Sequence, residues 1–189
     1  MAIRTFLALD LEETIRGALV EAVGGLPEAG SKIRWVAPAN LHVTVKFLGD
    51  VAEGDVDAVC GAVAEAAGRG EPFDFDVVGL RCIPAGGRLR MIWAGVREPT
   101  GRFDALFGQL ESALTPLGFE PERRKFSPHV TLARVKSAPN AGGLRAAAGA
   151  HAETRFGTQR AAEVTVYSSR LTPDGPIYTP MARPRIGPA

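Results

Sequence analysis

Several features that mark common protein classes are scarce or missing in this chain of 189 residues. It has only two cysteines, Cys60 and Cys82, whose spacing fits neither a metal site nor a redox motif. Its apolar runs are too short to span a membrane. The opening segment, residues 1–10, lacks a signal-peptide cleavage site and has the pattern of a strand. We therefore expect a cytoplasmic protein with reduced thiols and no membrane partner.

An excess of charge of either sign is also missing. The 22 Lys and Arg residues nearly balance the 21 Asp and Glu residues, which leaves a formal net charge of +1. This balance argues against a long nucleic-acid groove that ignores base sequence. It remains compatible with a local basic pocket, and the basic run at 123–125 favours one in that region.

Two common catalytic signatures are absent from the sequence. There is no serine in a nucleophile-elbow motif and no glycine-rich loop followed by lysine that would cradle a nucleotide phosphate. Ester hydrolysis through a serine nucleophile and the use of ATP are therefore not expected.

The hydrophobic pattern changes repeatedly between the period of a strand and that of a helix. Helices are expected over 11–26, 53–70 and 103–119, and strands over 3–9, 33–36, 41–49, 73–83, 88–96, 128–135, 161–172 and 176–184. The Ala- and Gly-rich stretch at 138–149 is expected to be a mobile loop or a short helix. This order predicts an α+β protein in which helices pack outside antiparallel sheets. The length fits one domain, or two small lobes that share a core.

The phrase His-Val-Thr-aliphatic occurs twice, at 42–45 and 129–132, although the chain has only three histidines. Because side chains alternate along a strand, the His and Thr of each phrase point to the same side. The aliphatic residues between and after them point the opposite way, into the core. Each phrase therefore presents one imidazole and one hydroxyl from a rigid strand.

Two imidazoles and two hydroxyls suit the cleavage of a phosphodiester. Histidine titrates near neutrality, so one ring can take a proton from water while the other gives a proton to the leaving oxygen. Hydroxyls, together with the guanidinium of Arg134 three residues after the second Thr, can hold the phosphate oxygens. The residues alone predict metal-free cleavage, most easily of a strained cyclic diester. They do not decide which histidine is the acid.

Other interpretations of single residues were weighed against this one. Two histidines without a third ligand at suitable spacing make a poor zinc site, so no metal is expected. His151, in the Ala- and Gly-rich stretch, is expected at the surface. Trp35 and Phe47 fit a core role better than stacking on a base, whereas Phe126, beside the second phrase, is expected to line the substrate pocket.

The chain resembles the two-histidine (2H) phosphoesterases, whose hallmark is a pair of His-x-Thr-x motifs. The flanking segments LHVTVKFLGD, KFSPHVTLARV and VTVYSSRLTPDGPIY, with RTFLALDL at the start, are similar to the RNA 2′,3′-cyclic phosphodiesterases, also called 2′-5′ RNA ligases. The resemblance covers nearly the whole chain. It implies one domain over 1–189, built from two interleaved antiparallel-sheet lobes with outer helices. A pseudo-two-fold axis would relate the lobes, with the active site in the central cleft.

The resemblance also implies an activity and a role for each motif residue. RNA 2′,3′-cyclic phosphate ends would be hydrolysed to 2′-phosphates without metal, cofactor or ATP, and the reverse reaction would form 2′-5′ linkages. By position, His42 would be the proton donor to the departing O3′, and His129 the proton acceptor that activates water. Thr44 and Thr131 would hold phosphate oxygens, and Arg134 matches the arginine that follows the second motif.

Two alternatives remain open from the sequence. The first is a 2H phosphodiesterase for a small cyclic nucleotide or an ADP-ribose cyclic phosphate. The second, a non-catalytic module that binds RNA ends, is disfavoured because both motifs are complete. The expected partner is the substrate itself, either RNA with a 2′,3′-cyclic phosphate end or a small cyclic nucleotide. A chain of this size is expected to be a monomer.

Overall fold

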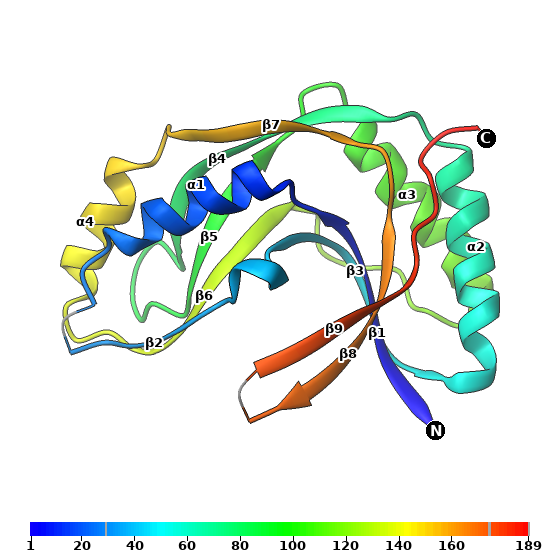
Figure 1. The fold of residues 1–189 in the computed structure, drawn as a ribbon, viewed down its shortest axis with the longest axis horizontal. Coiled ribbons are helices and arrows are strands. Elements are labelled where there is room, and N and C mark those ends of the chain that lie inside the picture. Colours follow the sequence, from blue (N-terminus) through cyan, green and yellow to red (C-terminus); the bar gives the residue numbers. More distant parts are fainter. Residues whose placement is uncertain (29, 174, 189) are drawn as a thin grey trace.

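A computed structural model of the chain describes residues 1–28, 30–173 and 175–188 (Figure 1). Its helices are α1 (Glu13–Gly24), α2 (Val56–Gly68), α3 (Arg102–Leu114) and α4 (Ala141–Ala150). Its strands are β1 (Ala2–Asp10), β2 (Lys32–Trp35), β3 (His42–Ala52), β4 (Phe73–Ile83), β5 (Met91–Arg97), β6 (His129–Ser137), β7 (Arg155–Ala161), β8 (Thr165–Thr172) and β9 (Gly175–Ala182). The predicted α+β class is confirmed.

The strands form one hydrogen-bonded path in the order β7-β4-β5-β6-β3-β1-β8-β9. Strand β2 lies outside this path and pairs with β6 at residues 133–137. The pairings within the described residues are antiparallel. The path narrows between β3 and β6, which pair through Val43 and Val130. This narrow join separates two groups of strands, which we call the β6 lobe (β2, β4, β5, β6 and β7) and the β3 lobe (β1, β3, β8 and β9).

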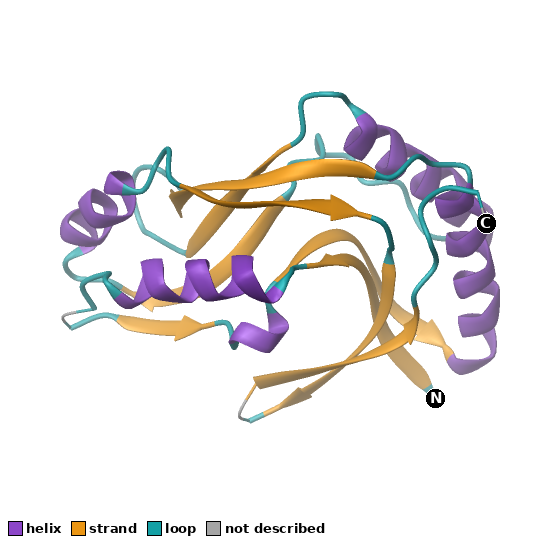
Figure 2. Ribbon diagram, turned by 45° about the horizontal axis from the view of Figure 1, so that its top comes forward, coloured by secondary structure: helices purple, strands orange, loops and turns teal. Residues whose placement is uncertain are grey.

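The helices lie on the outside of the strands, as expected. Helices α1 and α4 lie beside β7 and β4, and α2 packs against α3 at the opposite end of the molecule (Figures 1 and 2). None of the helices within the described ranges is long and apolar enough to cross a membrane.

The core follows the alternation that the two motifs predicted. Val43, Val45, Val130 and Leu132 are all less than 5% exposed, while the His and Thr residues between them are half-buried on the other side. Burial of these inward residues stabilises the fold by about 25 cal/mol for each Å² of apolar surface removed from water. This burial fixes which face of each strand carries the polar groups.

The stretch at 138–149, expected to be a mobile loop or a short helix, contains the short helix α4. Leu144 and Ala148 of this helix are buried, and the Asn140 side chain caps its first turn by accepting from Gly143 N. One element differs from the sequence-based expectations. Strand β7 was missed. Its residues carry few apolar side chains, so the sequence pattern does not indicate a strand. The segment is a strand because its backbone pairs with β4.

Candidate active site

His42 begins β3, and its imidazole is held in one orientation by two hydrogen bonds. Nδ1 lies 2.8 Å from the carbonyl oxygen of Asn40, and Nε2 lies 2.9 Å from Oγ1 of Thr44. A carbonyl only accepts, so Nδ1 carries the hydrogen and Nε2 of the neutral ring accepts from the threonine hydroxyl. Burial lowers the pKa of His42, an effect opposed by the bond to Asn40 and by the charge of Asp10. The ring therefore presents a proton-accepting Nε2 to the cleft.

His129 begins β6 and repeats this arrangement with different neighbours. Its Nδ1 lies 2.8 Å from the carbonyl oxygen of Ser127, so Nδ1 again carries the hydrogen and Nε2 is the free position. The ring stacks on Trp93 with centroids 3.6 Å apart and planes inclined by 15°. Burial lowers the pKa of His129, and the bond to Ser127 opposes this shift. In both motifs, the backbone carbonyl two residues upstream sets the tautomer.

The narrow join between the lobes brings the two motifs together. Val43 and Val130, the central residues of the motifs, are direct partners in an antiparallel pair. Continuing this register places each histidine opposite the threonine of the other motif. Side chains directly opposite each other are about 5 Å apart at Cβ. Alternation along the two strands therefore puts the two imidazoles and the two hydroxyls on one face of the sheet.

A β-bulge in β6 aims Arg134 at the same face. Relative to β5, β6 has one extra residue between Thr131 and Ala133. As a result Leu132 and Ala133 are both buried, and the alternation restarts so that Arg134 faces the cleft side with Thr131. Without the bulge, a residue three positions after Thr131 would face the opposite side of the sheet.

β3 has a matching irregularity after its own motif. Its register against β1 shifts between Thr44 and Lys46, so Val45 and Lys46 are both buried and Phe47 faces the cleft. The buried Lys46 ammonium is paired with Glu111 on α3 at 2.6 Å. The prediction that Phe47 belongs to the core is wrong, because its side chain is 67% exposed and lines the cavity.

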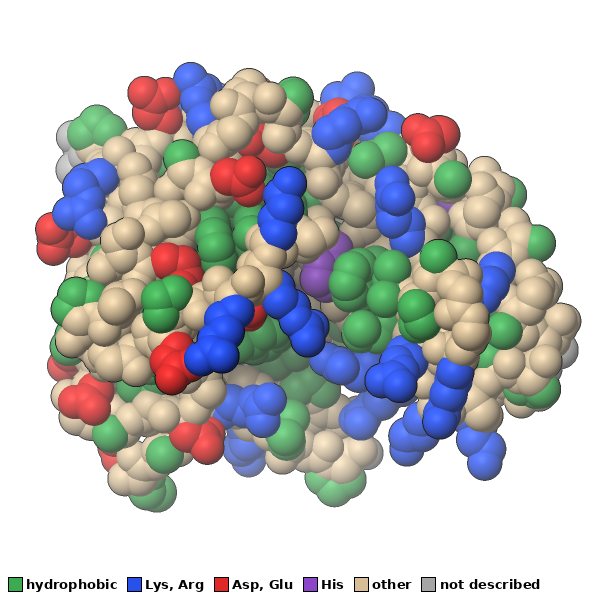
Figure 3. Space-filling model, turned by 180° about the vertical axis from the view of Figure 1, so that it is seen from behind, with side chains coloured by type: hydrophobic (Ala, Val, Ile, Leu, Met, Phe, Trp, Pro, Cys, Tyr) green, Lys and Arg blue, Asp and Glu red, His purple; other side chains and the backbone are tan. Residues whose placement is uncertain are grey.

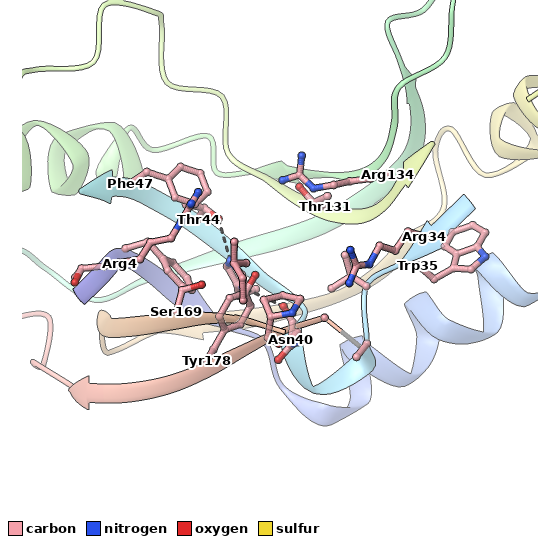
Figure 4. A pocket seen from close by; sticks show the side chains of 18 of the residues that line it. Arg4, Arg34, Trp35, Asn40, Thr44, Phe47, Thr131, Arg134, Ser169 and Tyr178 are labelled. Atoms are coloured by element: carbon pink, nitrogen blue, oxygen red, sulfur yellow. Dashed lines mark hydrogen bonds between the residues drawn. The ribbon is translucent and has the colours of Figure 1, made fainter. Parts of the chain in front are cut away.

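A cavity of about 320 Å³ opens on this face, and four of the predicted site residues line it: His42, Thr44, Thr131 and Arg134 (Figure 4). Besides several small or aliphatic residues, the side chains around them include basic, polar and aromatic ones: Arg4, Arg34, Asn40, Ser169, Phe6, Trp35, Phe47 and Tyr178. Lys and Arg side chains surround a hollow on one face of the molecule, in which a histidine is visible (Figure 3). The expected local basic pocket is therefore present, although its lining arginines come from β1, β2 and β6 rather than from the run at 123–125.

A second and larger cavity, of about 750 Å³, is bordered by His129 and Trp93. Phe126 lines this second cavity rather than the one that holds His42. Its ring stacks on Phe107 of α3, with centroids 4.3 Å apart, and meets Phe103 edge-on. A substrate role for Phe126 stays a prediction.

Asp10, at the end of β1, is the nearest acidic neighbour of the first motif, because it pairs directly with His42 in the sheet. Its carboxylate accepts hydrogen bonds from Thr165 at 2.9 Å, Tyr167 at 2.6 Å and Arg183 at 2.8 Å. Burial and the bond to Asp10 raise the pKa of Tyr167 to about 12. Tyr167 therefore stays a hydrogen-bond donor to the Asp10 carboxylate.

Sequence reasoning missed several of these neighbours. Asn40 and Ser127 act through backbone carbonyls, which no side-chain pattern reveals. Arg34 and Tyr178 come from strands whose position beside the cleft depends on tertiary pairing. Within the described ranges, no group of three or more His, Cys, Asp or Glu side chains could hold a metal ion.

The fold and the paired motifs define a two-histidine phosphoesterase. The sequence profile of the family described as LigT like Phosphoesterase matches residues 9–93 and 95–178. The chain belongs to this family.

Individual relatives are similar over nearly the whole chain. The RNA 2′,3′-cyclic phosphodiesterase of Methanothermobacter thermautotrophicus is 36% identical, over 96% of this chain and 97% of the relative. The crystal structure of TT0787 of Thermus thermophilus superimposes with a TM-score of 0.81 at 27% identity, over 98% of each chain. E. coli LigT complexed with 3′-AMP superimposes with a TM-score of 0.79 at 25% identity, over 98% of this chain and 99% of LigT.

Proposed function

We propose that the chain hydrolyses the 2′,3′-cyclic phosphate at an RNA end to a 2′-phosphate by acid–base catalysis between two histidines, without a metal ion. The observation that supports this proposal is the antiparallel pairing of the two motifs through Val43 and Val130. His42, Thr44 and Thr131 line one cavity, and His129 borders the second. The activity named for the relative from Methanothermobacter, an RNA 2′,3′-cyclic phosphodiesterase, supports the substrate class.

The chemical step needs one proton acceptor and one proton donor. Nε2 of His129 takes a proton from water as the water oxygen attacks phosphorus. The bond from phosphorus to O3′ breaks, and O3′ takes a proton from Nε2 of His42, which leaves the phosphate on O2′. The two histidines exchange their protonation states in the step, and exchange with solvent restores them.

The different surroundings of the two histidines support His42 as the acid. In a cyclic phosphate the leaving O3′ stays attached to the nucleoside, so the acid belongs on the side that holds the nucleoside. His42 lies in the first cavity, where the exposed ring of Phe47 is free to stack on a base. His129 borders the second cavity, where Trp93 already stacks on His129 itself. The charge of Asp10 also favours the protonated form of His42.

Phosphate binding would complete the protonation of His42. In the free site the Thr44 hydroxyl donates to Nε2 of His42. A bound anion favours the imidazolium, whose Nε2–H then donates toward the leaving oxygen. The Thr44 hydroxyl is released to a phosphate oxygen, where Thr131 adds a further donor.

The second cavity gives the attacking group a separate approach. Water reaches His129 from that side in hydrolysis, and a 5′-hydroxyl that replaced water there would be activated in the same way. This exchange would produce a 2′-5′ linkage by reversal of the same step. Water is in large excess, so hydrolysis is expected to dominate.

A 2′,3′-cyclic-phosphate oligonucleotide tests the proposal when it is incubated with the protein in EDTA and the product isomer is identified. The expected product is the 2′-phosphate. His42→Ala and His129→Ala are each expected to lower kcat by about 100-fold to 10,000-fold. His151→Ala, a change of the third histidine outside both cavities, is the matched control and should leave kcat unchanged. A 3′-phosphate product, or turnover only after a metal ion is added, would contradict the mechanism.

A further inference from the structure

Arg34 on β2 and Arg134 on β6 are direct partners across an antiparallel strand pair. Their side chains therefore leave the sheet on the same face, about 5 Å apart at Cβ. Like charges in this position repel each other and destabilise a sheet. The pairing is therefore unfavourable in the free protein, unless something negative lies between the two guanidinium groups.

The residues that the structure describes offer little charge compensation at this position. Of the described residues, no carboxylate lies within ion-pairing distance of Arg34 or Arg134. Among those that line the first cavity, none is acidic. Both arginines line that cavity together with Thr131 (Figure 4). An anionic ligand that enters this cavity can therefore lie between the two guanidinium groups and offset their repulsion.

The anion between these arginines is not the reacting phosphate itself. Arg134 follows Thr131 by three residues, of which the bulge takes up one, so it lies two positions, or about 7 Å, further along the strand. Arg34 starts from the next strand out, and a carbon atom added to Gly175, at the β9 end of the cavity, would lie 3.6 Å from its Nη2. The space between Arg34 and Arg134 therefore lies to one side of the position between the two histidines.

We propose that Arg34 and Arg134 form a second anion subsite, which binds the phosphate on the 5′ side of the terminal nucleotide while the cyclic phosphate lies between the histidines. This subsite builds on the proposed function and narrows its substrate class. A nucleoside 2′,3′-cyclic phosphate has one phosphate and leaves the arginine pair unoccupied. An RNA end has a second phosphate one ribose away, so the substrate favoured by this site has at least two phosphates.

Three substrates with the same terminal nucleotide test the subsite: the nucleoside 2′,3′-cyclic phosphate, its 5′-phosphorylated form, and the dinucleotide with a 2′,3′-cyclic end. For the wild-type protein, the dinucleotide is expected to exceed the nucleoside compound in kcat/KM by about tenfold to a hundredfold. Arg34→Gln should remove this preference and leave kcat/KM for the nucleoside compound within about twofold. The 5′-phosphorylated compound shows whether the subsite needs a phosphodiester or only a phosphate. Its kcat/KM should equal that of the dinucleotide if any phosphate at this position suffices, and should be lower if the diester is required. Either result supports the subsite.

Arg160→Gln is the matched control, because it removes the same charge from an exposed strand position of the same sheet that lines neither cavity. It should leave the preference intact. The subsite is overturned if the wild-type protein does not prefer the dinucleotide. It is also overturned if Arg34→Gln weakens all three substrates equally, or if Arg160→Gln removes the preference as well.

A binding measurement keeps the subsite testable without turnover. The dissociation constants of a 3′-phosphorylated dinucleotide and of the matching nucleoside 3′-phosphate are compared over a series of salt concentrations. Arg34→Gln should weaken only the dinucleotide, and the slope of log K against log salt should fall by about 0.7, the value for one phosphate contact on a single strand. An unchanged slope contradicts the subsite. Absence of turnover by the wild-type protein contradicts the proposed function instead, and leaves this comparison valid.

Discussion

At the scale of single residues, the two candidate catalytic histidines make the same hydrogen bond within their motifs but have different surroundings. Each histidine is fixed through Nδ1 by a carbonyl two residues upstream, at 2.8 Å in both motifs. The motif therefore supplies two equivalent bases. What distinguishes them lies outside the motif: His42 has the anion of Asp10 on the neighbouring strand, and His129 has the face of Trp93. In the proposed mechanism, these neighbours determine which histidine is the acid and which is the base.

The lowered pKa values of the two histidines predict an activity optimum below the ordinary histidine pKa of about 6.5. The base, His129, must be neutral, so activity falls as pH drops through its lowered pKa. The acid, His42, must be protonated, so activity falls as pH rises through its lowered pKa. The profile of kcat/KM, which reports the free enzyme, should be bell-shaped with both limbs at acidic pH. The alkaline limb of kcat should lie higher, because the bound phosphate anion raises the pKa of His42. A kcat/KM that rises continuously through pH 8 would rule out His42 as the acid.

The Asp10–Arg183 pair allows the charge beside His42 to be changed in both directions. Asp10→Asn removes the anion, so the pKa of His42 should fall and the alkaline limb of kcat/KM should move to lower pH. Arg183→Gln removes the cation that offsets Asp10, so the same limb should move to higher pH. The acid limb, set by His129, should stay in place in both variants. Equal shifts in the same direction would indicate a structural effect instead.

At the scale of elements, the sequence predicted the two motif strands well, and the bulges limited what it could say beyond them. His42, Thr44, His129 and Thr131 are placed by simple alternation, because the aliphatic residues between them must be buried. Alternation places Phe47 on the wrong face, because a bulge leaves no mark in the apolar pattern. The same limit applies to Arg34, since which strand lies beside β6 depends on long-range pairing and not on the composition of β2.

The bulge in β3 buries Lys46. We expect the ion pair with Glu111 to stabilise this bulge, because it neutralises the buried charge. The two side chains are only 7% and 12% exposed. Glu111→Gln leaves a buried ammonium without its counter-charge and should lower the free energy of unfolding by about 3 kcal/mol. Adding Lys46→Met should recover most of this loss, because no unpaired charge remains. Glu65→Gln breaks an exposed pair with Arg69 and serves as the control, with an expected change below about 0.5 kcal/mol. A double variant as unstable as the single one would contradict this account.

At the scale of the whole molecule, the chain passes repeatedly from one lobe to the other. It begins in the β3 lobe with β1, enters the β6 lobe for β2, and returns for β3. Strands β4 to β7 then complete the β6 lobe before β8 and β9 close the β3 lobe. Neither lobe is a continuous segment of the chain. Each lobe contains strands that are separated in the sequence by strands of the other lobe, so the two lobes are expected to fold together. We propose that the two interleaved lobes form one cooperative domain over 1–189.

Single-domain cooperativity predicts one unfolding transition, and the positions of the tryptophans make it testable. The only two tryptophans, Trp35 and Trp93, both belong to the β6 lobe, so their fluorescence reports on that lobe, whereas far-ultraviolet circular dichroism reports on both. The two probes should give the same midpoint in urea. Glu111→Gln removes the counter-charge of Lys46 in the β3 lobe, yet it should lower the fluorescence midpoint as much as the dichroism midpoint. Fluorescence that keeps the wild-type midpoint in this variant would mean that the β6 lobe unfolds independently, with the two histidines on separately stable halves of the protein.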